Sequence, residues 1–155
     1  MTPKEAIADA RSLARILARG NFAAPLRECK EIVRGDIKGN FDGTTAPDGG
    51  AWPPRKPRPG DDGHPLLNDT GFLKAAALGL GPGGFDELDG RSMSIGIDTD
   101  VDLGGIPGAN AHDHGYPPNN LPERHFFAAT EDGLDRCAEV IGDAGLEKLL
   151  AGGGG

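Results

Sequence analysis

A run of glycine and proline in the middle of the chain sets the main limit on its fold, because no regular helix or central strand can pass through it. Residues 42–65 hold six of the thirteen prolines and show neither a helical nor a strand period. The segment Pro53–Pro59 favours an extended, polyproline-like backbone with solvated amides. A loop of this length in a compact domain is usually functional or disordered. The run therefore predicts either a segment that wraps a neighbouring subunit or a loose surface loop.

Helical patterns precede this run. The spacing predicts a first helix that begins near Pro3 and ends at Gly20, and a second helix from Pro25 to Gly39–Asn40. Apolar residues of the second helix recur every three or four positions, as a helix with one buried face requires. They are Leu26, Cys29, Ile32, Val33 and Ile37. We interpret Cys29, like Cys137 near the other end of the chain, as a small core residue rather than as part of a zinc site or a disulfide framework.

Regular patterns return after residue 70. Alanines favour a short helix within residues 72–80, and strict alternation over residues 91–98 predicts a half-buried strand. A turn-rich stretch covers residues 98–118. A closing helix is predicted from Thr130, and we expect one apolar stripe of it to be buried. That stripe comprises Leu134, Cys137, Val140 and Ile141, extended by Leu146, Leu149 and Leu150.

These patterns predict an α/β (α+β) fold with N-terminal helices, a small and mainly antiparallel sheet, a C-terminal helix and long Gly/Pro-rich loops. A chain of 155 residues is most simply one domain. Within it we expect a helical arm at residues 1–40, a sheet with loops at residues 41–128, and the closing helix at residues 129–151.

Charge is unevenly distributed along the chain. The formal net charge is −8, yet residues 1–40 carry eight Lys/Arg against five Asp/Glu, so that the remainder is strongly acidic. A basic arm on an acidic body suits head-to-tail contact between copies, although a solvated helix face explains the arginines equally well. Net acidity argues against direct nucleic-acid recognition. The sequence also lacks an apolar segment long enough to span a membrane.

One cluster of residues has metal-binding character. His112, His114 and His125 carry imidazole nitrogens, which suit zinc and other transition metals. Alternate residues of an extended chain would put His112 and His114 on one face and turn Asp113 away from them. No close cysteine pair supports such a site. We therefore expect no metal, no cofactor and no catalytic residue, and keep a metal-dependent hydrolase as an alternative.

Four short motifs follow one another between Phe41 and Phe127. In order, they are Phe41 with Pro47-Asp48-Gly49 and Trp52; Leu66-Leu67 with Thr70-Gly71 and Leu73; Ala109 with His112 and Gly115; and Pro122 with Arg124, Phe126 and Phe127. The motifs and their order resemble the phage virion morphogenesis family, which comprises tail-completion proteins of tailed bacteriophages. The sequence departs from the family pattern at Gly108, where an aromatic residue is common, and in the enlarged stretches 53–65 and 98–108.

The resemblance implies a structural virion protein rather than an enzyme. It implies assembly in the bacterial host cytoplasm and a final place in the virion, where copies form a ring, a hexamer by the symmetry of the tail. The ring would sit at the head-proximal end of the tail, against the tail tube and the neck or connector proteins. The alternative within this class is a head–tail adaptor or a transient head morphogenesis factor.

The motifs supply the candidates for scaffold or intersubunit roles. These are Trp52, Leu67, Thr70, Gly71, His112, Gly115, Pro122, Arg124 and Phe126. Trp52 either fixes the proline-rich run to the body or anchors a neighbour. Thr70 is expected to cap the helix that begins at Gly71. The Arg124 guanidinium pairs either with a carboxylate of the next subunit or with one of its own chain.

Overall fold

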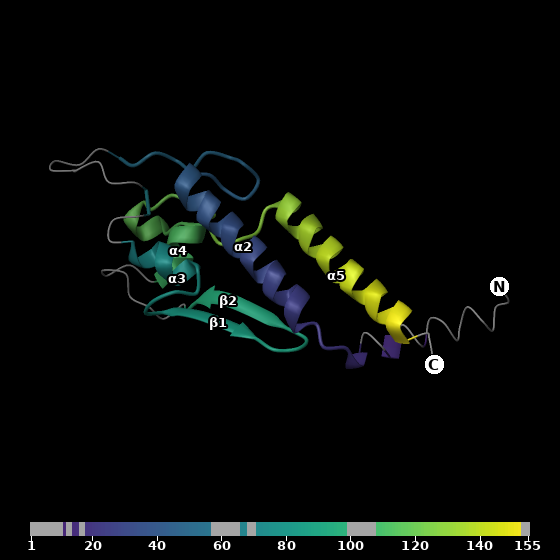
Figure 1. Cartoon of the computed structure of the whole chain (residues 1–155). Helices are drawn as coiled ribbons and strands as arrows, with labels where there is room; N and C mark the ends of the chain where they lie inside the picture. The colour runs from purple at the N-terminus through teal and green to yellow at the C-terminus, as the bar shows by residue number, and fades with distance from the viewer. Residues whose placement is uncertain are drawn as a thin grey trace.

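The computed structural model describes residues 11, 14–15, 18–56, 66–67, 71–98 and 108–152, which form a mixed α+β fold (Figure 1). This confirms the fold class predicted from the sequence. The described elements, in chain order, are α2 (Ala23–Gly43), α3 (Phe72–Ala77), β1 (Gly84–Leu88), β2 (Met93–Ile97), α4 (Gly108–His114), the 3-10 turn η1 (Pro117–Asn119) and α5 (Glu131–Gly152).

The second predicted helix is present as α2, but its predicted end at Gly39–Asn40 is wrong. The helix continues to Gly43 and ends where Thr44 adopts a left-handed conformation, with φ of 53°. The buried side-chain amide of Asn40 donates hydrogen bonds to the carbonyl oxygens of Phe126 and Ala128, both at 3.1 Å. These tertiary contacts outweigh the weak helix propensity of glycine and asparagine.

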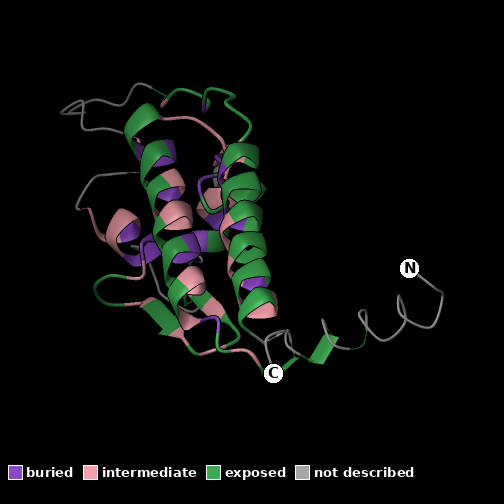
Figure 2. Cartoon of the chain, turned by 45° about the vertical axis from the view of Figure 1, so that its right-hand side comes forward, coloured by how far each residue is buried: buried purple, intermediate pink, exposed green. Residues whose placement is uncertain are grey.

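Small residues allow α5 to lie directly against α2, and the two helices run side by side in both views (Figures 1 and 2). Cys29 Sγ lies 3.6 Å from the carbonyl oxygen of Cys137, and Cys137 Sγ lies 3.7 Å from that of Cys29. Both thiols are free and buried, as predicted. Burial is the main cause that raises the pKa of Cys137 to about 11, which keeps this thiol protonated and unreactive.

The closing helix is confirmed, but its predicted buried stripe is partly wrong. The side chains of Leu134 and Ile141 are exposed, whereas Gly133, Cys137 and Gly145 are buried. Most of the surface of α5 is exposed accordingly (Figure 2). A Cβ atom at Gly133 would come within 2.0 Å of Asp36 on α2, so the helix–helix contact selects small residues there and leaves the larger ones outside.

The sheet consists of β1 and β2, paired antiparallel with Gly84 opposite Ile97 and Leu88 opposite Met93. The alternating pattern correctly predicted β2. The sequence did not predict β1, because the strand begins in a glycine-rich stretch at residues 79–84, which favours turns rather than a strand. Residues of α2 and α3 contact both strands, so these helices and the sheet enclose one side of the core.

The main hydrophobic core combines residues of α2, α3 and α4 with two extended segments. Its buried members are Ile37, Phe41, Trp52, Leu73, Ala77, Leu78, Ala109 and Phe126. Phe41 lies at its centre: its ring centroid is 5.8 Å from that of Trp52 and 5.0 Å from that of Phe126. The first and the fourth sequence motif therefore meet at one side chain of α2.

Candidate functional site

The extended segment at residues 121–127 links Pro53 and Pro54 of the proline-rich run to the end of α4. The buried Arg124 makes contacts in both directions. Its backbone N–H donates to the carbonyl oxygen of Asp113 at 3.1 Å, while its guanidinium donates to the carbonyl oxygens of Pro53 at 3.1 Å and Pro54 at 3.5 Å. Burial, and then the charge of Arg55, lower the pKa of Arg124.

Backbone carbonyls thus take the place of the carboxylate that the sequence analysis expected for Arg124. Among the described residues, no ion pair involves Arg124. Only 6% of this residue is exposed, so its guanidinium is largely buried. Its geometry is that of an internal clamp on the Pro53–Pro54 backbone.

Trp52 fixes the same region through a hydrogen bond and through packing in the core. The indole Nε1–H donates to the carbonyl oxygen of His125 at 2.8 Å, and the ring packs edge-on against Phe41. Only 6% of Trp52 is exposed. Of the two roles considered for this residue, the structure shows the one in which it fixes the proline-rich region to the body.

His112–His114 were expected to lie in a turn-rich stretch, and they instead form the last turn of α4. Ala109 faces the core, and His112 follows it by three residues on the same side of the helix. Gly115 ends the helix with φ of 80°, and a Cβ atom there would come within 3.0 Å of the Glu123 backbone nitrogen. The spacing of this motif therefore reflects a buried helix face and a left-handed helix end.

His112 is separated from the other histidines by this helical geometry. Its Nδ1 atom is buried and lacks a hydrogen-bond partner within the described part of the chain. Burial, followed by the charge of Arg124, lowers the pKa of His112, so the neutral ring is favoured. The shared face for His112 and His114 that an extended chain would give is therefore not observed.

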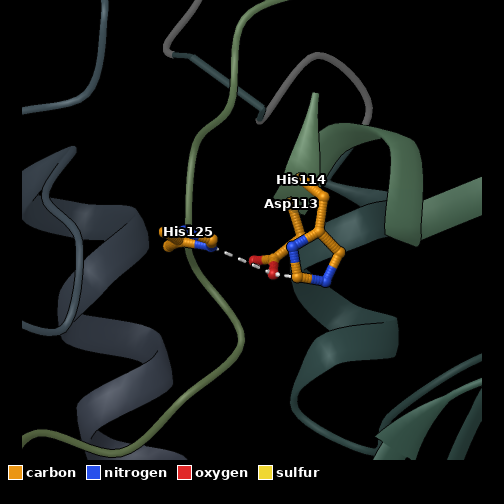
Figure 3. Close-up of side chains that lie close together, drawn as sticks. All are labelled: Asp113, His114 and His125. Carbon is orange, nitrogen blue, oxygen red and sulfur yellow. Dashed lines mark hydrogen bonds and ion pairs between the residues drawn. The ribbon is translucent and has the colours of Figure 1, made fainter. Parts of the chain in front are cut away.

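Asp113 takes the place of His112 beside the other two histidines. One carboxylate oxygen, Oδ1, accepts hydrogen bonds from the backbone N–H groups of Phe126 at 2.8 Å and Phe127 at 3.2 Å. The other, Oδ2, lies 3.3 Å from His125 Nδ1 and 3.6 Å from His114 Nε2. Figure 3 shows the carboxylate between the two imidazole rings. Asp113, His114 and His125 form the one group among the described residues whose donor atoms are close enough to share a metal ion.

Sequence reasoning missed Asp113 because it considered the candidate metal site only for an extended chain. A glycine three residues after His112, with an alanine three residues before it, is also the pattern of a helix end. That pattern would have placed Asp113 and His114 in the last helical turn. It would not have indicated that His125, eleven residues later in an extended segment, lies opposite them.

The other candidate residues are spread through the scaffold rather than gathered in one site. Leu67 has a φ of 56° and packs against the core, and Gly71, with φ of 74°, precedes the first turn of α3. Pro122 is half-buried, and Phe126 is fully buried. The cap predicted for Thr70 lies outside the described residues.

Basic residues of the N-terminal region divide into two groups. On α2, Lys30 and Arg34 both form ion pairs with Asp86 of β1, and the Arg34–Asp86 distance is 2.5 Å. Both charges are therefore paired within the chain. Arg11, Arg15 and Arg19 are instead helical and exposed. Because they are four residues apart, they form one face of a helix. We call them the arginine stripe.

The outer face of α5 has a matching acidic pattern. Asp135, Glu139, Asp143 and Glu147 are exposed and four residues apart, and we call them the acidic stripe. Leu146 and Leu150 are exposed on the same helix, at 55% and 73%. Across the described ranges, none of the ion pairs involves a member of either stripe.

Within the described part of the chain, no helix combines the length and the apolar character needed to cross a membrane. Comparison of the chain with protein-family models, with curated proteins and with solved structures finds no match in any of the three.

Proposed function

We propose that this protein is a structural subunit that completes the tail of a bacteriophage or a phage-like particle. The observation that carries the proposal is the order of the four motifs between Phe41 and Phe127. The structure is consistent with a scaffold role for these motifs, since Trp52, Leu73, Ala109 and Phe126 pack in one core. The proposed role is assembly without catalysis, in a virion whose parts are made in the bacterial cytoplasm.

The proposed assembly is a ring of copies joined head to tail. Such a ring requires two different complementary surfaces on each subunit. The arginine stripe and the acidic stripe meet this requirement: they have opposite charge, the same four-residue spacing and exposed side chains. The arginine stripe of one copy would lie along the acidic stripe on α5 of the next copy. Leu146 and Leu150 of α5 would add apolar area to the contact.

The charged stripes provide orientation, and the apolar residues provide part of the affinity. Rows of exposed charges accelerate and orient association more than they stabilise the final complex. The two exposed leucines of α5 would lose water-accessible apolar surface in the contact, which is favourable at roughly 25 cal/mol per Å². Six copies are expected from the symmetry of the tail, with the tail tube and the neck or connector proteins as the other partners.

The test has two parts. Sedimentation velocity or native mass spectrometry at low ionic strength should give a species that is a multiple of the 16.0 kDa chain, with six copies as the expected number. Electron microscopy of particles that carry a labelled copy should then place the label at the neck end of the tail. A strict monomer, even in the presence of tail and neck proteins, would count decisively against the proposal.

Mass spectrometry of separated heads and tails distinguishes the remaining possibilities. A tail-completion subunit should be present in purified tails before they join heads. Detection only in heads would identify a head–tail adaptor instead. Detection only in immature particles would identify a transient head morphogenesis factor.

A further inference from the structure

The Asp113 carboxylate is held in a fixed orientation. Its Oδ1 atom accepts two backbone hydrogen bonds, from Phe126 and Phe127. These contacts use one oxygen and leave Oδ2 directed at the two imidazoles, and the side chain is largely buried, with 14% exposed. The orientation of a metal-binding carboxylate is commonly fixed by such outer hydrogen bonds. Asp113 therefore presents one negatively charged oxygen whose position is set by the fold.

His125 is oriented by a second carboxylate. Its Nε2 atom contacts Glu123 Oε1, while its Nδ1 atom faces Asp113 Oδ2. If Nε2 carries the proton and donates to Glu123, Nδ1 keeps a free lone pair beside Asp113 Oδ2. A carboxylate behind a ligand histidine is the usual support of this ligand in metal sites, because it fixes the tautomer and raises the basicity of the ring.

The distances between the donor atoms fit a small transition-metal ion. Tetrahedral bonds of about 2.0–2.1 Å place neighbouring ligand atoms about 3.3–3.4 Å apart. The two edges that include Asp113 Oδ2 measure 3.3 Å and 3.6 Å, and all three donor atoms lie within 4.8 Å of one another. Closing the remaining edge requires a shift of at most about 1.5 Å. The His114 side chain, 62% exposed at the end of α4, is free to make this shift.

We propose that Asp113 Oδ2, His114 Nε2 and His125 Nδ1 bind a divalent transition-metal ion, with Zn²⁺ as the best fit, and that Glu123 positions His125. Two nitrogen donors and one carboxylate suit zinc, cobalt, nickel or copper far better than magnesium or calcium, which prefer oxygen donors throughout. With three ligands from the chain, the fourth position is left to water. The ion would tie the last turn of α4 to the segment at residues 121–127.

This inference does not depend on the proposed function. It assigns the ion a structural effect: binding to the folded state alone raises the stability of that state.

The experiment uses the full-length protein, treated with a chelator and then titrated with Zn²⁺ in a calorimeter. The expected result is one ion per chain and a higher melting temperature with Zn²⁺ than without it. Titration with Co²⁺ should produce the strong visible absorption of a four-coordinate site. The matched variants are Asp113→Asn, which retains the Oδ1 acceptor for the backbone, and His114→Ala, which removes an exposed ring.

Each of these two variants should lower Zn²⁺ affinity by more than about 100-fold, beyond the 10–100-fold range typical of an outer-shell change. Glu123→Gln keeps an acceptor for His125 and should lower affinity by about tenfold. Glu87→Gln, which changes an exposed carboxylate on β1, should leave affinity unchanged. Circular dichroism verifies that each variant is folded.

Two outcomes would overturn the proposal. One is the absence of both heat and visible absorption in the wild-type titrations, which is expected if His125 instead bridges Asp113 and Glu123 as an imidazolium ion. The other is Zn²⁺ binding that Asp113→Asn and His114→Ala leave unchanged, which would place the ion elsewhere on the chain.

Discussion

The Nε–H of Arg124 donates a hydrogen bond to the backbone carbonyl oxygen of Pro53, 71 residues earlier in the chain, at 3.1 Å. This contact links the fourth motif to the proline-rich run, which is far from it in the sequence. Proline lacks a backbone N–H, so a proline-rich segment cannot fix itself by regular backbone pairing. Its carbonyl oxygens remain available, and a buried guanidinium with donors in a planar fork can bind two of them in succession.

Arg124→Ala should lower the free energy of unfolding by about 2–3 kcal/mol, because hydrogen bonds to a charged group are lost and the Pro53 carbonyl is left without its donor. Arg124→Lys should lie between the alanine variant and the wild type, since an ammonium group lacks the fork geometry. Urea unfolding followed by the fluorescence of Trp52, the only tryptophan, measures both effects.

Limited trypsin digestion gives an independent measure of the same clamp. Cleavage after Arg55 should be faster in Arg124→Ala than in the wild type. Cleavage after Arg91, in the exposed turn between β1 and β2, should be unchanged and serves as the internal control. Equal rates at Arg55 in the two proteins would show that Arg124 does not hold this region.

Trp52→Phe tests the polar contact of the indole separately from its packing. The variant keeps an aromatic ring against Phe41 but loses the hydrogen bond to the carbonyl oxygen of His125, and should cost about 1–2 kcal/mol. Trp52→Ala also opens a cavity and should cost about 3–5 kcal/mol. Circular dichroism must follow the unfolding, because both variants lack tryptophan. Equal costs for the two variants would contradict the division between polar contact and packing.

Gly115→Ala should destabilise the protein by about 1–3 kcal/mol, because it strains a left-handed helix end and crowds the Glu123 backbone. Gly142→Ala is the matched control on α5. A Cβ atom at Gly142 has nothing within 4 Å, and this substitution should stabilise the protein by about 0.5–1 kcal/mol through helix propensity. Thermal unfolding should therefore shift in opposite directions for the two glycines.

The Asp86 carboxylate links stability to acid pH. Its hydrogen bond with Lys30 is the main cause that holds the pKa of Asp86 below its usual value of 3.8, and Arg34 adds to this effect against an opposing contribution from burial. A pKa that is lower in the folded state means that the stabilisation is present above about 3.8 and is lost as the pH falls through the folded value. The wild type should therefore lose stability below about pH 3.8.

Asp86→Asn should remove this contribution at every pH. At neutral pH it should cost about 2 kcal/mol, between the values for exposed and buried ion pairs, because Lys30 is left buried without its partner. Its stability should then decline less steeply than that of the wild type as the pH falls. Urea midpoints between about pH 2.5 and pH 7 test both statements. An acid decline as steep in the variant as in the wild type would assign the effect to other groups.

Local patterns predicted the elements whose signal lies in their own residues. Alternation identified β2, and a three-to-four spacing identified α2 and α5, because one face of each element is buried. The predicted end of α2 was wrong because the Asn40 side chain donates hydrogen bonds to Phe126 and Ala128, which are far away in the sequence. The predicted buried stripe of α5 was partly wrong because the contact of this helix with α2 selects glycine and cysteine rather than leucine.

The same distinction applies to the candidate sites. Trp52 and Phe126 were identified by their size and motif context, and both lie in the core. The group Asp113, His114 and His125 was not identified in its final composition. It depends on the conformation of a single helical turn, which decides whether His112 or Asp113 faces His125.

Reversal of the charged stripes tests the proposed subunit contact. The first variant carries Arg11→Glu, Arg15→Glu and Arg19→Glu, and the second carries Asp135→Lys, Glu139→Lys and Asp143→Lys. Each variant alone should fail to assemble, because stripes of like charge would then face each other between copies. All of these side chains are exposed in the structure, so each variant should fold as the wild type does.

An equimolar mixture of the two variants should assemble again. In an alternating ring, the glutamate stripe of the first variant faces the lysine stripe of the second, and the next contact pairs the native arginine and acidic stripes. Alternation closes only for an even number of subunits, which six copies satisfy. Sedimentation at low ionic strength measures the recovery, and added salt should weaken it because exposed charges are screened. Assembly of either variant alone to the wild-type size would show that the ring, if it forms, uses other surfaces.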